Sequence, residues 1–560
     1  MTSIADHLHA VPADGLDADL ARLLAEWLPR QRWYGGKGAH IAADGVTVLA
    51  RLDLLPDRDP GLAVVVIEVR PEGRTPERYQ LFLGARRQLP GALEHVELGL
   101  LHGSDGVEWH CYDALHDPEL AGWLLGRLAA GEVIGPLRFH LLPGHRINKG
   151  LRSLVLTGEQ SNTSVIYGDK LIAKFLRRAV AGANPDLELS LALADCGSRN
   201  IPQPVGWIDL TLDLDGDQAA QAGGGPAGVS EGSAKADAPT AGSGSGSGAS
   251  GPAGAAASGG RNAADSESGP RPGADPAAEG GSAAENGSGH GRTNGYPAYS
   301  GPEPITVATV SEFLPTATDG WLLAQTSVRD LYAQLPSTDP QAAGADFGPE
   351  ARRLGKATAR VHHDLATSLP TGRLEPEDLA RVADGMIQHL HLAAERVEEL
   401  KPYVAALSAE LAALGELDKP VQTQRVHGDF HLGQVMRTVD GWVLLDFEGE
   451  PSRTLAERRA MAPAVKDVAG MARSFDYAAH HLGGEPEGAL RWAEHNFDAF
   501  CRGYASVSGH DPREQVTLLR AYEIDKAVYE AVYEATNRPT WLAIPLGAIR
   551  RLTGGGGESL

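Results

Sequence analysis

Hydrophobic and polar positions follow two different periods along the chain. Between residues 46 and 115, four segments alternate or run apolar between turn residues, as β-strands do: VTVLARLDLL, LAVVVIEVR, RYQLFLGA and VEWHCYDAL. From about residue 328 to 414, and again over 486–537, apolar residues recur at helical spacing with few interrupting glycines or prolines. The pattern predicts an α+β chain with a β-rich first half and a mainly helical second half.

One long segment shows neither period. Residues 215–296 are rich in Gly, Ala, Ser, Pro, Asp and Glu, a composition that buries too little apolar surface to offset chain entropy. Strand-like text stands on both sides, PVGWIDLTLDL before it and ITVATVSEFL after it. We therefore predict a disordered insertion in the loop of a hairpin that these two runs form, because long loops add little closure entropy.

These changes divide the chain into three parts. Residues 1–95 are predicted to form an N-terminal module, and 96–314 a β-rich lobe that the insertion 215–296 interrupts. Residues 315–556 form the helical lobe. A short connector near Glu312–Leu314 joins the two lobes.

Composition and charge restrict the classes of function. A chain of 560 residues with 42% hydrophobic content can build two or more domains. The net charge of −23 argues against nucleic acid and anionic membranes as partners, and no apolar run reaches the roughly 18–20 residues that cross a bilayer. The polar N-terminus lacks signal-peptide features, and three widely spaced cysteines are expected to be buried structural thiols: Cys111, Cys196 and Cys501. Both features predict a cytoplasmic protein.

The segment RVHGDFHLGQVMRTVDGWVLLDFEGE, residues 425–450, carries the candidate chemistry. His427 and His431 lie four apart around Asp429, a spacing that resembles a zinc-binding pair on a helix. Gly428 lies between them and favours a loop, in which the two imidazoles would not share one face. Zinc is therefore the weaker interpretation.

The same segment suits phosphoryl transfer. A kinase needs one carboxylate to accept the proton of the acceptor hydroxyl, and a second carboxylate with an amide oxygen to hold Mg²⁺. Gln434 follows Asp429 by five residues, and a hairpin predicted around Asp440-Gly441 carries Asp446 back beside it. Taken alone, the two acids are also explained as turn residues that cap this hairpin.

Upstream text supplies elements that suit a nucleotide. A small-residue turn presents backbone N–H groups and hydroxyls, which fit phosphate, at Ser161, Asn162, Thr163 and Ser164. Lys174 lies on the second strand of a hairpin predicted around Gly168-Asp169, although an isolated strand lysine is usually solvated. Glu188 stands near the start of a helix capped by Asn184, where a glutamate can pair with Lys174. The order of loop, lysine, glutamate, connector, HGD and hairpin aspartate is specific in combination.

This arrangement resembles the aminoglycoside-phosphotransferase-like kinases, and more closely the actinobacterial maltokinases. The similar text spans both ends of the chain: QRWYGGKG, EQSNTSVIYGDKLIAKFLRR, ANPDLEL, FLPTATDGW, HGDFHLGQVMRT, GWVLLDFEGEP, KDVAGMARSFDYAA and LLRAYEIDKAVYEAVYEATNRPTWLAIPL. The resemblance implies a two-lobed, protein-kinase-like fold behind an N-terminal cap module. It implies ATP-dependent phosphorylation of maltose to maltose 1-phosphate for α-glucan synthesis from trehalose, with trehalose synthase as a possible partner. Either a monomer or a homodimer is compatible with it.

The resemblance also implies residue roles. Asp429 is the general base, Gln434 and Asp446 are Mg²⁺ ligands, and Lys174 binds the phosphates with Glu188 as its partner. ATP contacts are further expected at Ser161, Asn162, Thr163, Ser164, Glu312 and Leu314. Asp467 is expected to brace the catalytic loop from a helix.

A sugar-binding face is predicted on the C-terminal helix, where Lys526, Tyr529 and Tyr533 recur at helical spacing. Arg538, Arg473 and Tyr477 are further sugar-binding candidates; the alternative is an ordinary packed stripe. Three rival functions stay open: a glucosamine kinase, an aminoglycoside phosphotransferase and a non-catalytic pseudokinase scaffold. The tyrosine-rich helix and the SFDYAA text favour maltose, and the joint presence of Lys174, Asp429 and Asp446 argues against a scaffold.

Overall fold

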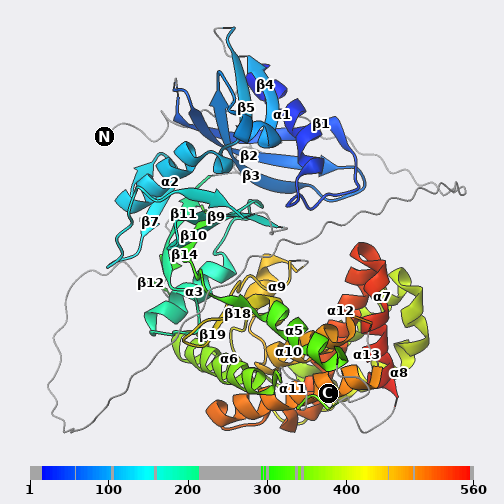
Figure 1. The fold of residues 1–560 in the computed structure, drawn as a ribbon. Helices are drawn as coiled ribbons and strands as arrows, with labels where there is room; N and C mark the ends of the chain where they lie inside the picture. The colour runs from blue at the N-terminus through cyan, green and yellow to red at the C-terminus, as the bar shows by residue number, and fades with distance from the viewer. Residues whose placement is uncertain are drawn as a thin grey trace, which may run out of the picture. The chain divides into compact units, whose positions relative to one another are not determined.

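The computed structural model describes residues 15–56, 58–102, 106–156, 161–212, 292–293, 296–297, 302–333, 339–341, 346–451, 453–483 and 486–554. Almost all of the predicted insertion, residues 215–296, lies outside these ranges, so its disorder stays a prediction. The described chain is an α+β protein, as the hydrophobic pattern predicts: strands dominate its first half and helices its second (Figure 1).

An antiparallel five-stranded sheet forms the N-terminal module. Its order is β1-β2-β3-β5-β4, and α1 (Gly15–Trp27) packs against β1 and β4 (Figure 1). The strands are β1 (Ile41–Leu55), β2 (Gly61–Pro71), β3 (Glu77–Arg86), β4 (Glu97–His102) and β5 (Glu108–Asp113). Val65 of β2 joins the core beneath α1, and Val64 joins the core shared with the next sheet. Both faces of β2 are therefore buried, which explains its continuous apolar sequence.

The module is longer than the sequence predicts. β5 pairs with β3, and β4 pairs with β5, so the boundary expected at residue 95 is wrong and the sheet continues to Asp113. Pro90 and Gly91 interrupt the strand pattern and give this stretch the composition of a linker. Instead, η3 (Gly91–Val96) turns the chain back to the same sheet.

The second sheet has seven strands in the order β6-β7-β11-β14-β10-β9-β8. Both predicted hairpins are confirmed. β9 (Asn162–Tyr167) and β10 (Leu171–Leu176) are joined at Gly168, whose φ of 63° is a left-handed conformation that glycine adopts without steric cost. β11 (Pro204–Leu210) and β14 (Ile305–Glu312) pair antiparallel with Leu210 opposite Ile305. The outer strands are β6 (Val133–Ile134), β7 (Leu137–Leu141) and β8 (Ser153–Val155).

Buried polar contacts join the two sheets. The backbone N–H of Gln80 on β3 donates to the carbonyl of Arg177, 2.8 Å away, just beyond the end of β10. The Arg177 guanidinium lies 2.5 Å from Asp113 and donates to the Thr163 hydroxyl at 2.8 Å. The N-terminal module is therefore attached to the strand that begins with the predicted phosphate-binding residues.

Helices build the second half around one core. α6 (Gly348–Ser368) packs against α11 (Pro486–Ser508), and α10 (Val465–His480) against α12 (Val516–Asn537). The other helices are α5 (Gly320–Ala333), α7 (Pro376–Arg396), α8 (Val404–Gly415), α9 (Leu455–Arg459) and α13 (Ala543–Thr553). α3 (Pro185–Asp195) adds residues of its own to this core, so it links the second sheet to the helices.

Cysteine placement only partly follows expectation. Cys111 and Cys501 are buried, as predicted, but Cys196 is exposed. Cys196 is exposed because it follows the last turn of α3, where the chain leaves the core. Among the described residues, no helix combines the length and apolar character needed to cross a membrane.

Candidate active site

The HGD segment is a loop held by a buried carboxylate. Gly428 has a φ of 85°, which ends any helical continuation from His427. Asp467 on α10 accepts the backbone N–H of His427 at 2.8 Å and that of Gly428 at 2.9 Å, and His362 lies 2.9 Å from it. Burial raises the pKa of Asp467, but these contacts outweigh burial and hold it below its usual range. Asp467 therefore braces the loop, as the sequence predicts.

The zinc alternative does not fit this loop. Nε2 of His427 lies 2.7 Å from the carbonyl oxygen of Leu445, so it carries a proton and donates it. Nδ1 of His431 accepts the N–H of Gly433 at 3.1 Å. Within the described ranges, no group of three or more His, Cys, Asp or Glu side chains is placed to hold a metal on its own. The histidines organise the loop instead.

The predicted hairpin brings the second aspartate to this loop. β18 (Val435–Arg437) pairs with β19 (Trp442–Leu444), and Nε2 of Gln434 lies 3.2 Å from Oδ2 of Asp446. Asp446 has a φ of 63°, a left-handed conformation that is uncommon outside glycine and concentrates at functional sites. Hydrogen bonds hold this turn, because the N–H of Leu445 donates to the Gln434 carbonyl and that of Phe447 donates to Asp186.

Lys174 reaches the second aspartate from β10 of the seven-stranded sheet. Its Nζ lies 2.6 Å from Oδ1 of Asp446 and 2.8 Å from Oε1 of Glu448. Burial lowers the pKa of Lys174, but these carboxylates outweigh burial and raise it well above its usual value. The lysine is therefore charged and is placed beside the predicted metal ligand.

Glu188 is not the partner of Lys174. It accepts from Arg425 at 2.6 Å and from Arg459 at 3.2 Å, both in the helical lobe. Asp186, two residues earlier on α3, points to the Lys174 cluster instead; burial, with repulsion from nearby acids, raises its pKa to about 6. The physical reason is helical phase, because two residues along a helix differ by roughly 200° in direction. The pairing expected for Glu188 is corrected accordingly.

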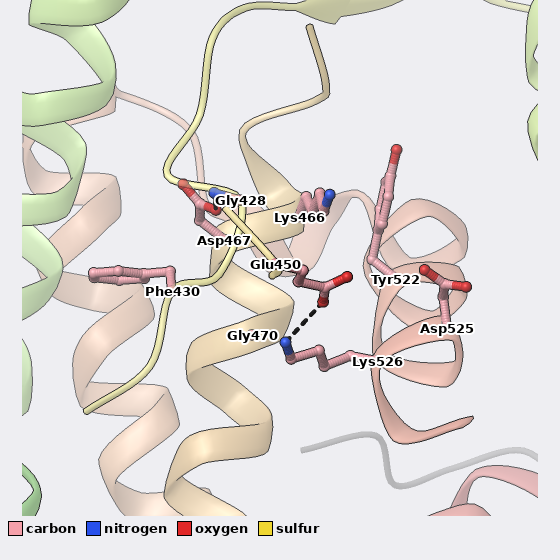
Figure 2. Close-up of a pocket in the computed structure, with 9 residues that line it drawn as sticks. All are labelled: Gly428, Phe430, Glu450, Lys466, Asp467, Gly470, Tyr522, Asp525 and Lys526. Carbon is pink, nitrogen blue, oxygen red and sulfur yellow. Dashed lines mark hydrogen bonds and ion pairs between the residues drawn. The ribbon is translucent and has the colours of Figure 1, made fainter. Parts of the chain in front are cut away.

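The candidate base is paired with a lysine of the C-terminal helix. Nζ of Lys526 lies 2.8 Å from Oδ1 of Asp429 and 2.8 Å from Oε1 of Glu450. Figure 2 shows Lys526 reaching from α12 toward Glu450 beside a small pocket between the catalytic loop, α10 and α12. Burial raises the pKa of Asp429, but Lys526 and His431 outweigh burial and hold it well below its usual range. Asp429 is therefore ionised.

Most of the predicted phosphate-binding residues are less exposed to solvent than expected. Asn162, Thr163 and Ser164 are buried, and the Thr163 hydroxyl accepts from Arg177. Ser161 is exposed, and residues 157–160 before it lie outside the described ranges. Glu312 ends β14 and donates its N–H to the carbonyl of Gln203, with Leu314 close behind in the connector. Contacts of these residues with ATP stay a prediction.

The predicted sugar face is assembled on α12. The rings of Tyr529 and Tyr533 lie 6.4 Å apart and nearly parallel, and Nζ of Lys526 lies 4.9 Å from the centre of the Tyr529 ring. Arg538 stacks on Tyr533 at 5.3 Å and is bonded to Glu534 at 2.8 Å. Lysine, two aromatic rings and an arginine therefore form a continuous row that starts at Asp429.

Two further sugar candidates lie inside the protein. The Arg473 guanidinium is 2% exposed and is bound by Asp476 at 2.6 Å and by Glu530 at 2.8 Å. Tyr477 is buried, with its hydroxyl 3.3 Å from Glu534. Arg473 is thus an internal ion-pair residue, which does not fit the sugar-binding role expected for it. The helical period of this part of the sequence predicts the spacing of Arg473 and Tyr477. It does not show which face of α10 the other helices bury.

Sequence reasoning missed three acids of the site: Asp186, Glu448 and Glu450. The last two stand two and four residues after Asp446 in DFEGE, a density of acids that would have drawn attention to the whole segment.

Comparisons with known proteins agree with this geometry. Residues 27–117 match the maltokinase N-terminal cap domain. Residues 302–510 match the phosphotransferase enzyme family. One part of the chain is thus similar to a maltokinase-type cap and another to a phosphotransferase-family domain. The cap match ends at residue 117, close to the end of the five-stranded sheet.

Two sequence relatives of this chain are described as glucosamine kinases. The protein from Streptacidiphilus jiangxiensis is 31% identical over 262 residues, which cover 44% of this chain and 57% of the relative. That from Mycolicibacterium smegmatis (strain ATCC 700084 / mc(2)155) is 28% identical over 261 residues, covering 45% and 63%. The matched part thus spans less than two thirds of either relative.

Solved structures show the same fold. A glucosamine kinase in complex with glucosamine, ADP and inorganic phosphate superposes with a TM-score of 0.56 at 20% identity, covering 96% of this chain and 98% of that one. Crystal form B of a glucosamine kinase superposes with a TM-score of 0.57 at 21% identity. The superposition covers 91% of this chain and 94% of that one. At this identity the likeness establishes the fold of the chain alone, and its chemistry has to be argued from the site.

Proposed function

We propose that this protein is an ATP-dependent sugar kinase that phosphorylates maltose at its reducing-end hydroxyl and forms maltose 1-phosphate. One observation carries the proposal. Lys174 lies 2.6 Å from Asp446, and the charges of Asp429 and Asp446 both act on His431, which supports the roles of phosphate lysine, metal ligand and base at one site. The cap and phosphotransferase matches support the same function. A role in α-glucan synthesis from trehalose, in the cytoplasm and beside trehalose synthase, belongs to this proposal.

The mechanism follows from the positions of these side chains. The acceptor hydroxyl donates its hydrogen bond to Asp429, which orients the oxygen and takes the proton as the oxygen attacks the γ-phosphorus of ATP. The new P–O bond forms while the bond to the β-γ bridging oxygen breaks and ADP leaves with the electron pair. Lys174 binds the phosphates and offsets their charge, which is where kinases gain most of their rate.

The residues around Asp446 fit a magnesium ion. The carboxylates of Asp446 and Glu448 and the amide oxygen of Gln434 are hard oxygen ligands, which Mg²⁺ prefers. Oε1 of Glu448 is buried and lies 2.8 Å from Lys174 but makes no hydrogen bond of good geometry, so it is an underused acceptor. When bound, the ion neutralises charge on the transferring phosphates.

The acceptor is argued from α12. Stacked aromatic rings suit the apolar faces of pyranose sugars, and Tyr533 stands seven positions after Lys526, or about 10 Å along the helix. That length exceeds one sugar ring and favours a disaccharide. A glucosamine kinase is the second candidate, because the sequence relatives and the solved structures of this fold are described as such.

A phosphoryl-transfer assay over a panel of acceptors tests the proposal. The panel contains maltose, glucose, glucosamine, trehalose and kanamycin, each with Mg²⁺ and ATP, and the product is identified by mass and by its anomeric phosphate signal. We expect maltose to give the highest kcat/KM. A higher kcat/KM for glucosamine would overturn the proposal that maltose is the acceptor. No transfer to any sugar would overturn the kinase assignment.

A further inference from the structure

Each of two half-buried lysines binds one acid of the reaction site and one acid of the segment 446–450. The groups are Lys174 with Asp446 and Glu448, and Lys526 with Asp429 and Glu450. The same five-residue segment therefore contacts both lysines. One lysine belongs to the nucleotide side of the site and the other to the acceptor side.

The segment runs close to the catalytic loop. Asp446 and Gly449 are both in the left-handed region, with φ of 63° and 72°. A Cβ atom built on Gly428 would lie 3.4 Å from Cα of Gly449, so the backbones of the catalytic loop and this segment pass close to each other. Glu450 itself is 6% exposed. Asp446 and Glu450 thus stand four residues apart on one short segment beside the catalytic loop.

Lys526 has a conflict at the start of the reaction. Its ammonium is 2.8 Å from a carboxylate oxygen of Asp429, the same group that has to accept the proton of the acceptor. Glu450 is an equally close partner, and the Tyr529 ring lies against the same ammonium. Lys526 can therefore leave Asp429 while it remains paired inside the protein.

We infer that Glu450 and Lys526 couple the nucleotide site to the acceptor site. Nucleotide phosphates draw Lys174 away from Asp446, the segment 446–450 shifts, and Glu450 takes Lys526 off Asp429. The acceptor hydroxyl then finds a carboxylate without a competing ammonium. Both residues act as positioning residues, and the inference rests on the proposed kinase function.

The coupling is measured by isothermal titration. The sugar that the acceptor panel identifies is titrated into the full-length protein, with and without saturating Mg²⁺ and the non-hydrolysable ATP analogue AMP-PNP. We expect the analogue to lower the Kd of the sugar at least about fivefold, the lower end of the usual range for coupled sites. Equal Kd values in the wild-type protein would overturn the inference, whereas the panel alone decides the proposed function.

Glu450→Gln is the diagnostic variant. It should bind AMP-PNP as the wild-type protein does, but its ratio of sugar Kd values should fall toward one. Glu457→Gln is the matched control, because it removes a carboxylate of the following helix, α9, whose hydrogen bonds go to Thr454. Glu450→Asp, which keeps the charge but shortens the reach, should also lose coupling and serves if Glu450→Gln does not fold. A wild-type ratio in a folded Glu450 variant would overturn the inference.

Discussion

Oε2 of Glu188 lies 2.6 Å from Nη1 of Arg425, a residue 237 positions later in the chain, and both side chains are less than 10% exposed. The contact fastens α3 to the strand-like residues that lead into the catalytic loop. α3 follows β10, the strand of the second sheet that carries Lys174. The ion pair therefore ties the helix after this strand to the helical lobe.

Glu188→Gln should therefore destabilise the fold. Removing one charge of a buried pair leaves the arginine uncompensated and typically costs about 3–5 kcal/mol. Glu398→Gln, on an exposed glutamate, is the control and should change the free energy of unfolding by less than roughly 0.5 kcal/mol. Urea denaturation measures both. If the Glu188→Gln variant kept its stability but lost most of its ATP binding, the expected pairing of Glu188 with Lys174 would be supported instead.

Asp429→Asn should abolish most turnover. A positioned general base contributes typically 10²–10⁴-fold, so kcat should fall by about that factor while ATP binding and Tm stay close to wild type. Asp440→Asn, on the exposed hairpin turn, makes the same chemical change without touching the site and should keep full activity. A folded Asp429→Asn protein with near wild-type kcat would remove Asp429 from the mechanism.

Removal of divalent metal should stop the reaction. Activity is expected to vanish with EDTA and to return with Mg²⁺ or Mn²⁺, because Asp446, Glu448 and Gln434 offer only oxygen ligands. The Asp446→Asn variant should need a much higher Mg²⁺ concentration for half-maximal rate. Recovery with Zn²⁺ alone would return attention to His427 and His431.

Glu523 on α12 predicts an unusual pH dependence of stability. Burial, as the main cause, raises its pKa from 4.5 to about 8. The folded protein holds this proton more tightly than the unfolded chain, so its contribution is complete below pH 4.5 and is lost as the pH rises toward 8. Each pH unit in that window changes the free energy of unfolding by at most about 1.4 kcal/mol for one proton.

Glu523→Gln should remove this dependence. The variant should therefore gain stability relative to the wild-type protein as the pH rises from 5 to 8, with the smallest difference at the acid end. Denaturation curves at pH 5.0, 6.5 and 8.0 give the comparison. Parallel pH profiles for the two proteins would mean that Glu523 is ionised in the fold.

The stretch between β11 and β14 should be dispensable for catalysis. Leu210 and Ile305 are direct strand partners, so a short Asn-Gly turn can connect the strands in place of the intervening residues. We expect the shortened protein to fold and to keep kcat/KM within about threefold, since surface loops tolerate changes of length. An unfolded or inactive product would show that the removed residues contribute to the structure or the site.

Local features of the site were predictable, and long-range pairings were not. The turns at Gly168 and Gly441 fixed both hairpins, because their dipeptides dictate the turn within a few residues. The partner of Glu188 depends on Arg425, and that of Asp429 on Lys526, which lie 237 and 97 positions away. No periodicity encodes such contacts, since they arise only when helices pack.

Domain boundaries failed for a related reason. The chain leaves the first sheet after Arg86 and returns to it at Glu97, and nothing local distinguishes a linker from such a return. The burial of Arg473 could not be predicted from the sequence either. An arginine on a mixed helix face is expected at the surface, but α12 supplies Glu530 as a second carboxylate partner and Arg551 of α13 binds the first, Asp476.

The pairing of β11 with β14 has a consequence for how the protein can be produced. Lys174 lies before this junction, whereas Asp429, Asp446 and Lys526 lie after it. Two separately expressed polypeptides, one ending after β11 and one starting before β14, would each lack part of the catalytic set. Phosphoryl transfer would then report on fragment complementation, and the junction would be a natural place to build a two-component biosensor.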